Sequence, residues 1–308
     1  MHSNVKLEDM LKSRRIPQVL LLIETSRAYG RGLVEGIAHY AEINGPWSIF
    51  FEERGLADPL PRWLKQWHGD GIISRTPHNA DIKKLIAMRL SMVELYARPK
   101  SDIPRVFQDE EAVGRLAAEH FFNCGLRNLA FFATDHVHWI EGRRRAYKQI
   151  LEQRGYPCHE LSFASGGQSA GGKSRQFDDR SVIRWLRKLP MPCGVFCASD
   201  FYAMRLMRAC RAGGIMVPEQ IAILGVDNDP VFCGTCFPRL SSIDLGSVRI
   251  GYEAAALLDQ MMAGKPAPAG GLRVEHLQLI ARESTDILAI DDADMALAAR
   301  MIREQACA

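Results

Sequence analysis

The sequence predicts an α/β protein whose parallel sheets are covered by helices on both faces. Short apolar runs of strand length alternate with segments of helical periodicity along most of the 308 residues. The run Ile221–Val226 is apolar without interruption, as in strands that are buried on both faces of a parallel sheet. The strand-helix pairs are too numerous for one small sheet. We therefore expect two sheets, with a break in the chain near Gly125.

The expected strands are short apolar runs that are bounded mostly by Gly, Pro or charged residues. They span residues 18–23, 47–52, 71–73, 92–96, 105–108, 128–133, 160–163, 194–198, 221–226, 240–243 and 274–281. Because most of them alternate with helices, we expect parallel pairing. No long linker separates the two halves, so we expect the chain to cross between them more than once.

The expected helices repeat apolar residues every three to four positions, and several end at Gly or Pro. Asp109 is a suitable N-cap for one of them, which Gly125 then ends. The set comprises residues 29–43, 59–66, 80–88, 110–124, 141–154, 179–189, 200–212 and 248–262. Residues 291–308 form a further amphipathic pattern with no later element to cover its apolar side, like the opening of another domain.

Composition places the chain among soluble globular proteins, with 47% hydrophobic and 24% charged residues. A formal charge of +3 is too small to indicate binding to nucleic acid or a membrane surface. The first fifteen residues form a polar leader without the apolar core of a signal peptide. The eight cysteines lie mostly inside apolar runs, which is typical of reduced, buried thiols and fits a cytoplasmic protein.

Polar residues follow three of the predicted strands, at the sheet edge where open α/β folds hold their ligands. Asp227 follows the strand Ile221–Val226, and Ser199 and Asp200 follow the strand before it. Arg143 lies in the first turns of a helix that begins just after another strand. We therefore expect Asp227, Asp200 and Arg143 to converge. Asp200 keeps a second interpretation, as the N-cap of the helix that it opens.

This combination indicates a saccharide site better than an acid–base pair. Carboxylates accept hydrogen bonds from sugar hydroxyls, and a guanidinium donates to two oxygens at once. An aromatic side chain such as Trp139 or Tyr29 can cover the C–H face of a sugar ring. Nothing in the pattern calls for catalysis, and we expect neither a cofactor nor a metal.

Three further motifs carry weaker signals. Gly167 to Ser174 matches the phosphate-loop pattern, but apolar helical periodicity begins only at Val182, which favours a surface loop over an NTPase site. Cys233 and Cys236 have C-x-x-C spacing without a second ligand pair. The remaining candidate is a histidine-rich loop that could hold a metal but is more typical of solvated side chains, with His136, His138 and Glu141.

The succession of segments resembles the effector-binding core of the lactose- and galactose-repressor family, which is related to periplasmic sugar-binding proteins. The matching segments are DEEAVG at 109–114, LAAEHF at 116–121, CGLRNLAF at 124–131, RRRAY at 143–147, CASD at 197–200, ILGVD at 223–227, PRLSSID at 238–244 and REST at 282–285. The resemblance implies a periplasmic-binding-protein-like fold of type I, made of two doubly wound subdomains. It implies an N-terminal subdomain of 16–125 plus 241–277 and a C-terminal subdomain of 126–240 plus 278–288.

Two departures from that family bear on function. The leader 1–15 leaves no room for the N-terminal DNA-binding domain of these repressors. The tail 289–308 is similar to the lead-in of an arabinose-activator-type DNA-binding domain. These departures imply the ligand-binding part of a dimeric transcription activator, with its C-terminal helix-turn-helix domain missing and operator DNA as the partner of that domain.

The resemblance also implies site residues and a ligand. From the C-terminal subdomain, Asp227 and Arg143 would bind sugar hydroxyls, helped by Ser199 or Asp200. The N-terminal subdomain would contribute Tyr29, Arg27 and Asp109. The ligand would be a pentose, with D-xylose as the first candidate. It would bind between the subdomains, which would close on it. A transport-type sugar-binding protein is the first alternative, and an NTPase built on residues 167–174 is the second.

Overall fold

The computed structural model describes residues 15–56, 58–96, 103–134, 138–161 and 179–287. The chain forms two compact units, each assembled from separate segments. Unit 1 comprises residues 1–108 and 247–274, and unit 2 comprises residues 109–246 and 275–308. The chain therefore passes between the units three times, which agrees with the expectation of several crossings.

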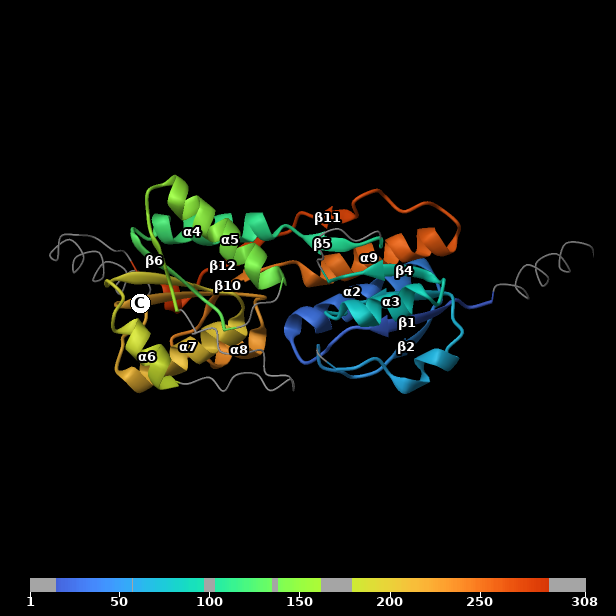
Figure 1. Cartoon of the computed structure of the whole chain (residues 1–308), viewed down its shortest axis with the longest axis horizontal. Helices are drawn as coiled ribbons and strands as arrows, with labels where there is room; N and C mark the ends of the chain where they lie inside the picture. Colours follow the sequence, from blue (N-terminus) through green and yellow to red (C-terminus); the bar gives the residue numbers. More distant parts are fainter. Residues whose placement is uncertain (1–14, 57, 97–102, 135–137, 162–178, 288–308) are drawn as a thin grey trace, which may run out of the picture. The chain divides into compact units, whose positions relative to one another are not determined.

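Within the described residues, unit 1 contains a four-stranded parallel sheet with the strand order β2-β1-β3-β4. Its strands are β1 (Gln18–Leu22), β2 (Ser48–Phe51), β3 (Gly71–Ser74) and β4 (Ser91–Glu94). A second parallel pair joins β5 (Val106–Gln108) to β11 (Leu272–Val274). Figure 1 shows the strands and helices of each unit.

The two faces of the β1–β4 sheet are covered by different helices. Leu20 and Ile72 point to one face, which is packed by the 3-10 helix η1 (Arg62–Gln66) and by α3 (Asn79–Ile86). Gly71 belongs to the other face, where it approaches Leu258 of α9 (Ser247–Met262). Helix α9 also packs against α2 (Ala28–Asn44). At Gly36 of α2 a Cβ would run into the carbonyl of Val248, so glycine permits this close helix approach.

Unit 2 contains a sheet with the strand order β12-β10-β9-β8-β6-β7 within the described residues. All neighbours pair in parallel except β12, which is antiparallel to β10. The strands are β6 (Asn128–Phe132), β7 (Cys158–Glu160), β8 (Cys193–Cys197), β9 (Ile221–Val226), β10 (Ser241–Asp244) and β12 (Gln278–Ile280). Every residue of β8 and β9 is buried, as their unbroken apolar sequences predict.

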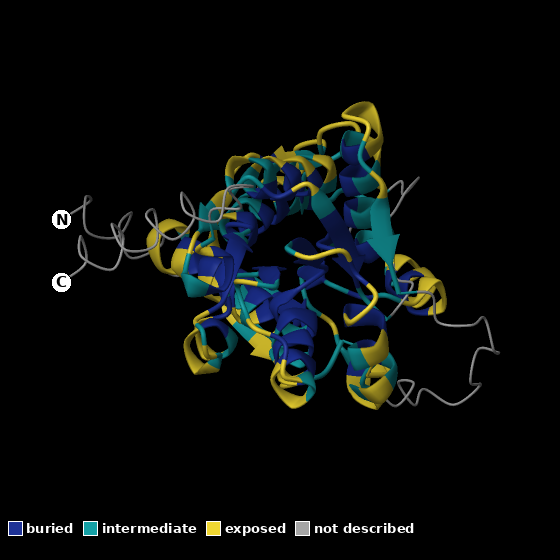
Figure 2. Ribbon diagram, turned by 90° about the vertical axis from the view of Figure 1, so that its left-hand side faces the viewer, coloured by how far each residue is buried: buried dark blue, intermediate teal, exposed yellow. Residues whose placement is uncertain are grey.

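Helices cover both faces of the unit 2 sheet (Figure 1). On one face, Phe121 of α4 (Glu110–Asn123) packs on β8, and Tyr147 of α5 (His138–Gln153) contacts Phe196. On the other, Phe132 contacts aromatic residues of α6 (Asp179–Leu186) and α7 (Asp200–Gly213). The short elements α8 (Pro230–Thr235) and η2 (Glu283–Thr285) complete the unit. Figure 2 shows buried strands and exposed outer helix faces.

Three expectations about the chain path differ from the structure. The units divide at Gln108 rather than near Gly125, because α4 packs on α5 and on the unit 2 sheet. Strand β10 pairs with β9 in unit 2, so the chain returns to unit 1 only at Ser247. The expected strand 274–281 is two strands, β11 and β12, in different units. Helix α8 was not predicted, since six residues give no readable periodicity.

In the part of the chain that the structure describes, no helix combines the length and the apolar character that crossing a membrane requires. The phosphate-loop pattern at 167–174 and the tail at 289–308 lie outside the described residues.

Candidate functional site

Asp200 is the centre of a buried hydrogen-bond network at the carboxyl edge of the unit 2 sheet. Its side chain accepts hydrogen bonds from the backbone N–H of Asp229 at 2.7 Å and from the hydroxyl of Ser242 at 2.6 Å. The N-cap of α7 is Ser199, which is buried but makes no side-chain capping bond. The N-cap interpretation of Asp200 is therefore wrong, because its carboxylate turns to β10 and the loop after β9 instead.

The surroundings of Asp200 favour its neutral form. Burial raises the pKa of its carboxyl group well above the usual value, and the charge of Asp227 nearby raises it further. A Cβ at Gly225 would run into the Asp200 carboxylate, so glycine in β9 allows this close approach. With an exposed fraction of 1% and its oxygens engaged, Asp200 fixes the loop rather than presenting itself to a ligand.

That loop has an unusual backbone. Asp227 and Asn228 have φ values of 106° and 48°, in the left-handed region that residues other than glycine rarely adopt. Asn228 is held there by its N–H to the Ser242 hydroxyl at 3.0 Å and by its side-chain amide to Asp244 at 3.2 Å. Arg282 donates to the Asn228 side-chain oxygen at 2.8 Å. A strained conformation that side chains hold in this way is typical of ligand-binding loops.

Arg143 lies at the same edge, as its position after β6 predicts. Its Nε donates to Glu110 at 2.6 Å, and its Nη1 donates to the carbonyl of Ala198, at the end of β8, also at 2.6 Å. Its guanidinium lies 4.8 Å from the centre of the Trp139 ring. The indole N–H of Trp139 is buried and has no hydrogen-bond partner in the described residues. An unmet buried donor beside a held guanidinium suits a ligand rich in oxygen.

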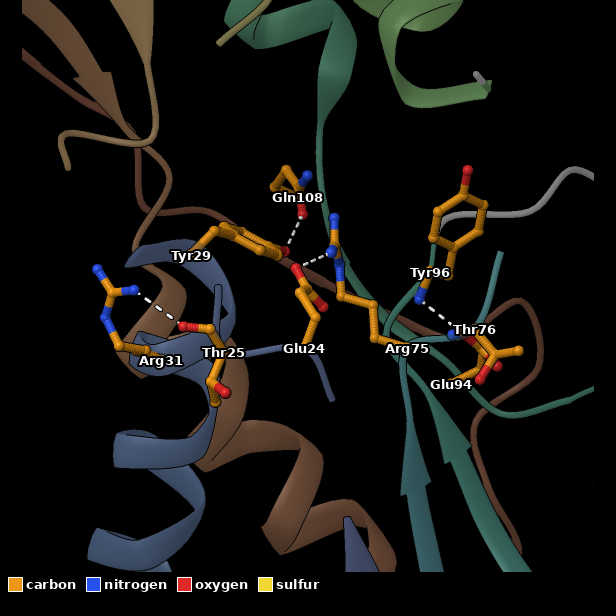
Figure 3. Close-up of polar contacts among 9 residues, drawn as sticks. All are labelled: Glu24, Thr25, Tyr29, Arg31, Arg75, Thr76, Glu94, Tyr96 and Gln108. Carbon is orange, nitrogen blue, oxygen red and sulfur yellow. Dashed lines mark hydrogen bonds and ion pairs between the residues drawn. The ribbon is translucent and has the colours of Figure 1, made fainter. Parts of the chain in front are cut away.

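Unit 1 has a polar cluster at the carboxyl edge of its own sheet, shown in Figure 3. Glu24, just after β1, pairs with Arg75, just after β3. The Arg75 guanidinium lies 4.8 Å from the centre of the Tyr29 ring and 5.9 Å from that of Tyr96. Tyr29 donates from its hydroxyl to Gln108 at 2.9 Å. The exposed fractions of Glu24 and Tyr29 are 2% and 5%, so the cluster is largely shielded from water.

Two further candidates lie at helix starts. Asp109 is the N-cap of α4, as predicted, and accepts from the N–H groups of Glu111 at 2.9 Å and Ala112 at 3.1 Å. It belongs to unit 2, whereas the resemblance implied the first subdomain. Arg27 occupies the N-cap position of α2 and is half-buried.

The cysteine pair and the histidine-rich loop do not form a redox or metal site within the described residues. Cys233 is buried, and its thiol donates to Asp200 at 3.5 Å. Burial raises the pKa of Cys236 to about 11, so that thiol stays protonated at neutral pH. No disulfide joins cysteines within the described ranges. His136 lies outside those ranges. Within them, no group of three or more His, Cys, Asp or Glu side chains is arranged to hold a metal ion.

Several residues of these clusters escaped the sequence reading. Five of them lie at the carboxyl end of a strand or at a helix start, which is the signal that could have found them: Glu24, Arg75, Glu94, Gln108 and Glu110. Two others carry no such signal, since Ser242 lies within β10 and Arg282 follows the antiparallel strand β12.

Comparison with protein families fits this architecture. Residues 118–285 match the model of the periplasmic binding protein-like domain. The chain belongs to this family. The periplasmic-binding-protein-like fold expected from the sequence is thereby confirmed.

The most similar proteins of this family include transcriptional regulators. The xylose operon regulatory protein of Haemophilus influenzae is 26% identical over 299 residues, which cover 94% of this chain and 76% of that protein. The protein of the same name from Escherichia coli K12 is 26% identical over 301 residues, covering 94% and 75%. Among solved structures, the xylose-binding transcription activator XylR superposes with a TM-score of 0.78 at 24% identity. That match covers 95% of this chain and 76% of the other.

Proposed function

We propose that this chain is the effector-binding part of a sugar-responsive transcriptional regulator. Its proposed ligand is a pentose, with D-xylose as the first candidate. The observation that carries the proposal is the similarity to two xylose operon regulatory proteins along 94% of the chain. Regulators of this kind bind an effector without transforming it, so the proposal includes no catalytic step.

Unit 2 supplies the polar groups that such a ligand requires. Arg143 presents a guanidinium that Glu110 and the end of β8 hold in place. Asp227 extends from the strained loop after β9, and Trp139 offers an indole N–H. We assign Arg143, Asp227 and Trp139 to direct sugar contact, because guanidinium, carboxylate and indole together match the hydroxyls and ring face of a sugar.

The remaining residues of unit 2 are assigned to positioning. Asp200 fixes the loop that carries Asp227, and Ser199 occupies the N-cap position of α7 beside it. In unit 1, Tyr29 and Arg27 lie after β1, and we propose that the cluster around Tyr29 contacts the same sugar. Asp109 starts α4 and has a positioning role in this proposal.

The regulatory step is a shift of conformational population. A sugar that binds one arrangement of the chain more tightly than another shifts the equilibrium towards the first. We propose that this shift controls operator binding by an arabinose-activator-type DNA-binding domain and that the regulator acts as a homodimer. The relatives leave about a quarter of their own length outside the match, which is compatible with such a domain.

Thermal melting against a panel of pentoses, hexoses and ATP with Mg²⁺ tests the proposal. A ligand at about 100 times its Kd stabilises the folded state by about 2.7 kcal/mol, which raises Tm by several degrees. We expect the largest shift with D-xylose and no shift with ATP. A shift with another sugar alone would change the identity of the proposed ligand and leave the proposed regulatory function standing. A shift with ATP alone would overturn the proposal.

The transport-type alternative needs a separate readout. A transport protein binds sugar with no effect on DNA. A regulator, expressed as the full-length protein, changes its affinity for operator DNA when the sugar is added. A full-length protein that binds D-xylose but gives no electrophoretic shift of the promoter, with or without the sugar, would favour the transport-type interpretation.

A further inference from the structure

Glu24 in unit 1 is a buried carboxylate with one unmet oxygen. One of its oxygens pairs with Arg75. The other, Oε2, is buried and has no hydrogen-bond partner among the described residues. Burying a carboxylate oxygen without a donor is costly, because the hydration that it loses is not replaced. Such an atom therefore points to a donor that comes from outside the chain.

A second carboxylate in the same unit shows what a purely structural one looks like. Glu94 is also buried, with an exposed fraction of 1%. It accepts from the Ser74 hydroxyl at 2.8 Å and from the backbone N–H groups of Tyr96 at 2.9 Å and Thr76 at 3.3 Å (Figure 3). Unit 1 thus supplies three hydrogen-bond donors to Glu94, whose role is structural. It leaves one oxygen of Glu24 without a donor among the described residues.

The charges around Glu24 decide which donor fits. Arg75 is already paired with Glu24, and its guanidinium lies near the rings of Tyr29 and Tyr96. Arg75 pairs with Oε1 of Glu24, and no donor among the described residues reaches Oε2. An anionic group entering here would meet the Glu24 carboxylate with little water to screen it. A neutral hydroxyl would instead donate to Oε2.

We propose that Glu24 determines ligand specificity by accepting a hydrogen bond from a hydroxyl of an uncharged sugar and by excluding sugar acids. The inference rests on the proposed sugar-binding function and refines it. It assigns the ligand to the uncharged polyhydroxy compounds. It also gives a role in ligand specificity to Glu24, which was not among the site residues predicted from the sequence.

The test compares three sugars that share one ring and differ at a single carbon. D-xylose carries only hydrogen there, D-glucose carries a hydroxymethyl group and D-glucuronate carries a carboxylate. Isothermal titration of the wild-type chain should give a Kd for D-xylose and no detectable binding of D-glucuronate. The glucose titration separates the effect of size from the effect of charge.

Glu24→Gln replaces the acceptor by an amide that also donates, and it releases Arg75 from its ion pair. We expect D-xylose to bind about tenfold more weakly, because a hydrogen bond to a charged group is lost. D-glucuronate should become measurable, so that the ratio of the two affinities moves by about 100-fold. Glu24→Asp, which keeps the charge and shortens the reach, should weaken D-xylose binding without admitting D-glucuronate.

Glu53→Gln is the matched control, because it removes an exposed carboxylate from the same unit and should change neither affinity. Unchanged affinities in Glu24→Gln would overturn the inference, since another donor would then satisfy the oxygen. Tighter wild-type binding of D-glucuronate than of D-xylose would overturn it as well and leave the sugar-regulator proposal standing. Binding of no sugar at all would overturn both.

Discussion

The two units organise their polar clusters in opposite ways. In unit 2 the backbone conformation is the central element, because Asp227 and Asn228 lie in the left-handed region and buried side chains hold them there. In unit 1 the central element is a pair of side chains, Glu24 and Arg75, beside aromatic rings. The loop that carries Asp227 therefore depends on many hydrogen bonds of moderate strength, whereas the Glu24 cluster depends on one buried ion pair.

This difference predicts how each cluster responds to the loss of one side chain. A network of hydrogen bonds loses one contribution at a time when a member is removed. A buried ion pair that loses one partner leaves an uncompensated charge, which costs more than the pair itself contributes. We therefore expect a larger effect on stability from breaking the Glu24–Arg75 pair than from removing any one member of the network around the Asp227 loop, where effects on stability and affinity should be graded.

Arg75→Met tests the strongest form of this contrast. It leaves the carboxylate of Glu24, which is 2% exposed, without its cation, so the free energy of unfolding should fall by about 3–5 kcal/mol. Urea unfolding followed by circular dichroism measures it. Arg31→Met is the control, because Arg31 is more exposed and donates to the carbonyl of Thr25 at 2.9 Å. Equal losses for the two variants would refute the central role of the ion pair.

Arg282→Ala tests the network of unit 2. Arg282 donates to the Leu240 carbonyl at 2.7 Å and to Asn228 at 2.8 Å, so its loss should lower the free energy of unfolding by about 2 kcal/mol. The affinity for sugar should fall too, because the strained loop loses a support. Arg239→Ala removes a neighbouring exposed arginine that pairs with Glu283 and should change neither quantity. Reduced stability with unaltered sugar affinity would show that Arg282 supports the fold and not the binding of sugar.

A smaller effect on stability is expected from the titration of His120, in unit 2. Burial lowers the pKa of His120 below its usual 6.5, and its ring contacts the Thr285 hydroxyl at 2.8 Å and the Cys124 thiol at 3.9 Å. Because the folded-state pKa is lowered, the contribution of His120 to stability is complete above pH 6.5 and is lost as pH falls through the folded-state pKa.

His120→Gln should weaken this pH dependence without reversing it. Hydrogen exchange localises the effect, since amides of α4 should lose protection on acidification in the wild type and amides of β1 should not. A pH dependence of equal size in both units would contradict the assignment to His120.

The sequence predicted the elements of the fold well, because most of them carry their own signal. The alternation of apolar runs and helical periodicity predicted the strands β1, β6, β8 and β9 within one residue at each end. The division of the chain was less readable. Helix α4 looks the same in sequence whichever sheet it covers, and its packing on α5 and on the unit 2 sheet assigns it to unit 2.

The candidate site was predicted where a strand leads directly into a polar residue. Asp227 was found in this way, Arg143 was found from its place in the first turns of the helix after a strand, and both lie at the expected edge. Glu24 and Glu110 were missed, because a carboxylate after a strand or at a helix start is common on protein surfaces. What distinguishes Glu24 is its burial, and the burial depends on residues that are distant in the sequence, such as Arg75.

Isothermal titration of D-xylose into the wild-type chain and into Asp227→Asn tests the central claim most directly. The account predicts one site per chain in the wild type and a Kd about 10 to 100 times higher in the variant, because an amide replaces a charged acceptor. The melting temperature of the unliganded variant should stay close to that of the wild type. Equal affinities in the two proteins, or no heat of binding in the wild type, would contradict the account.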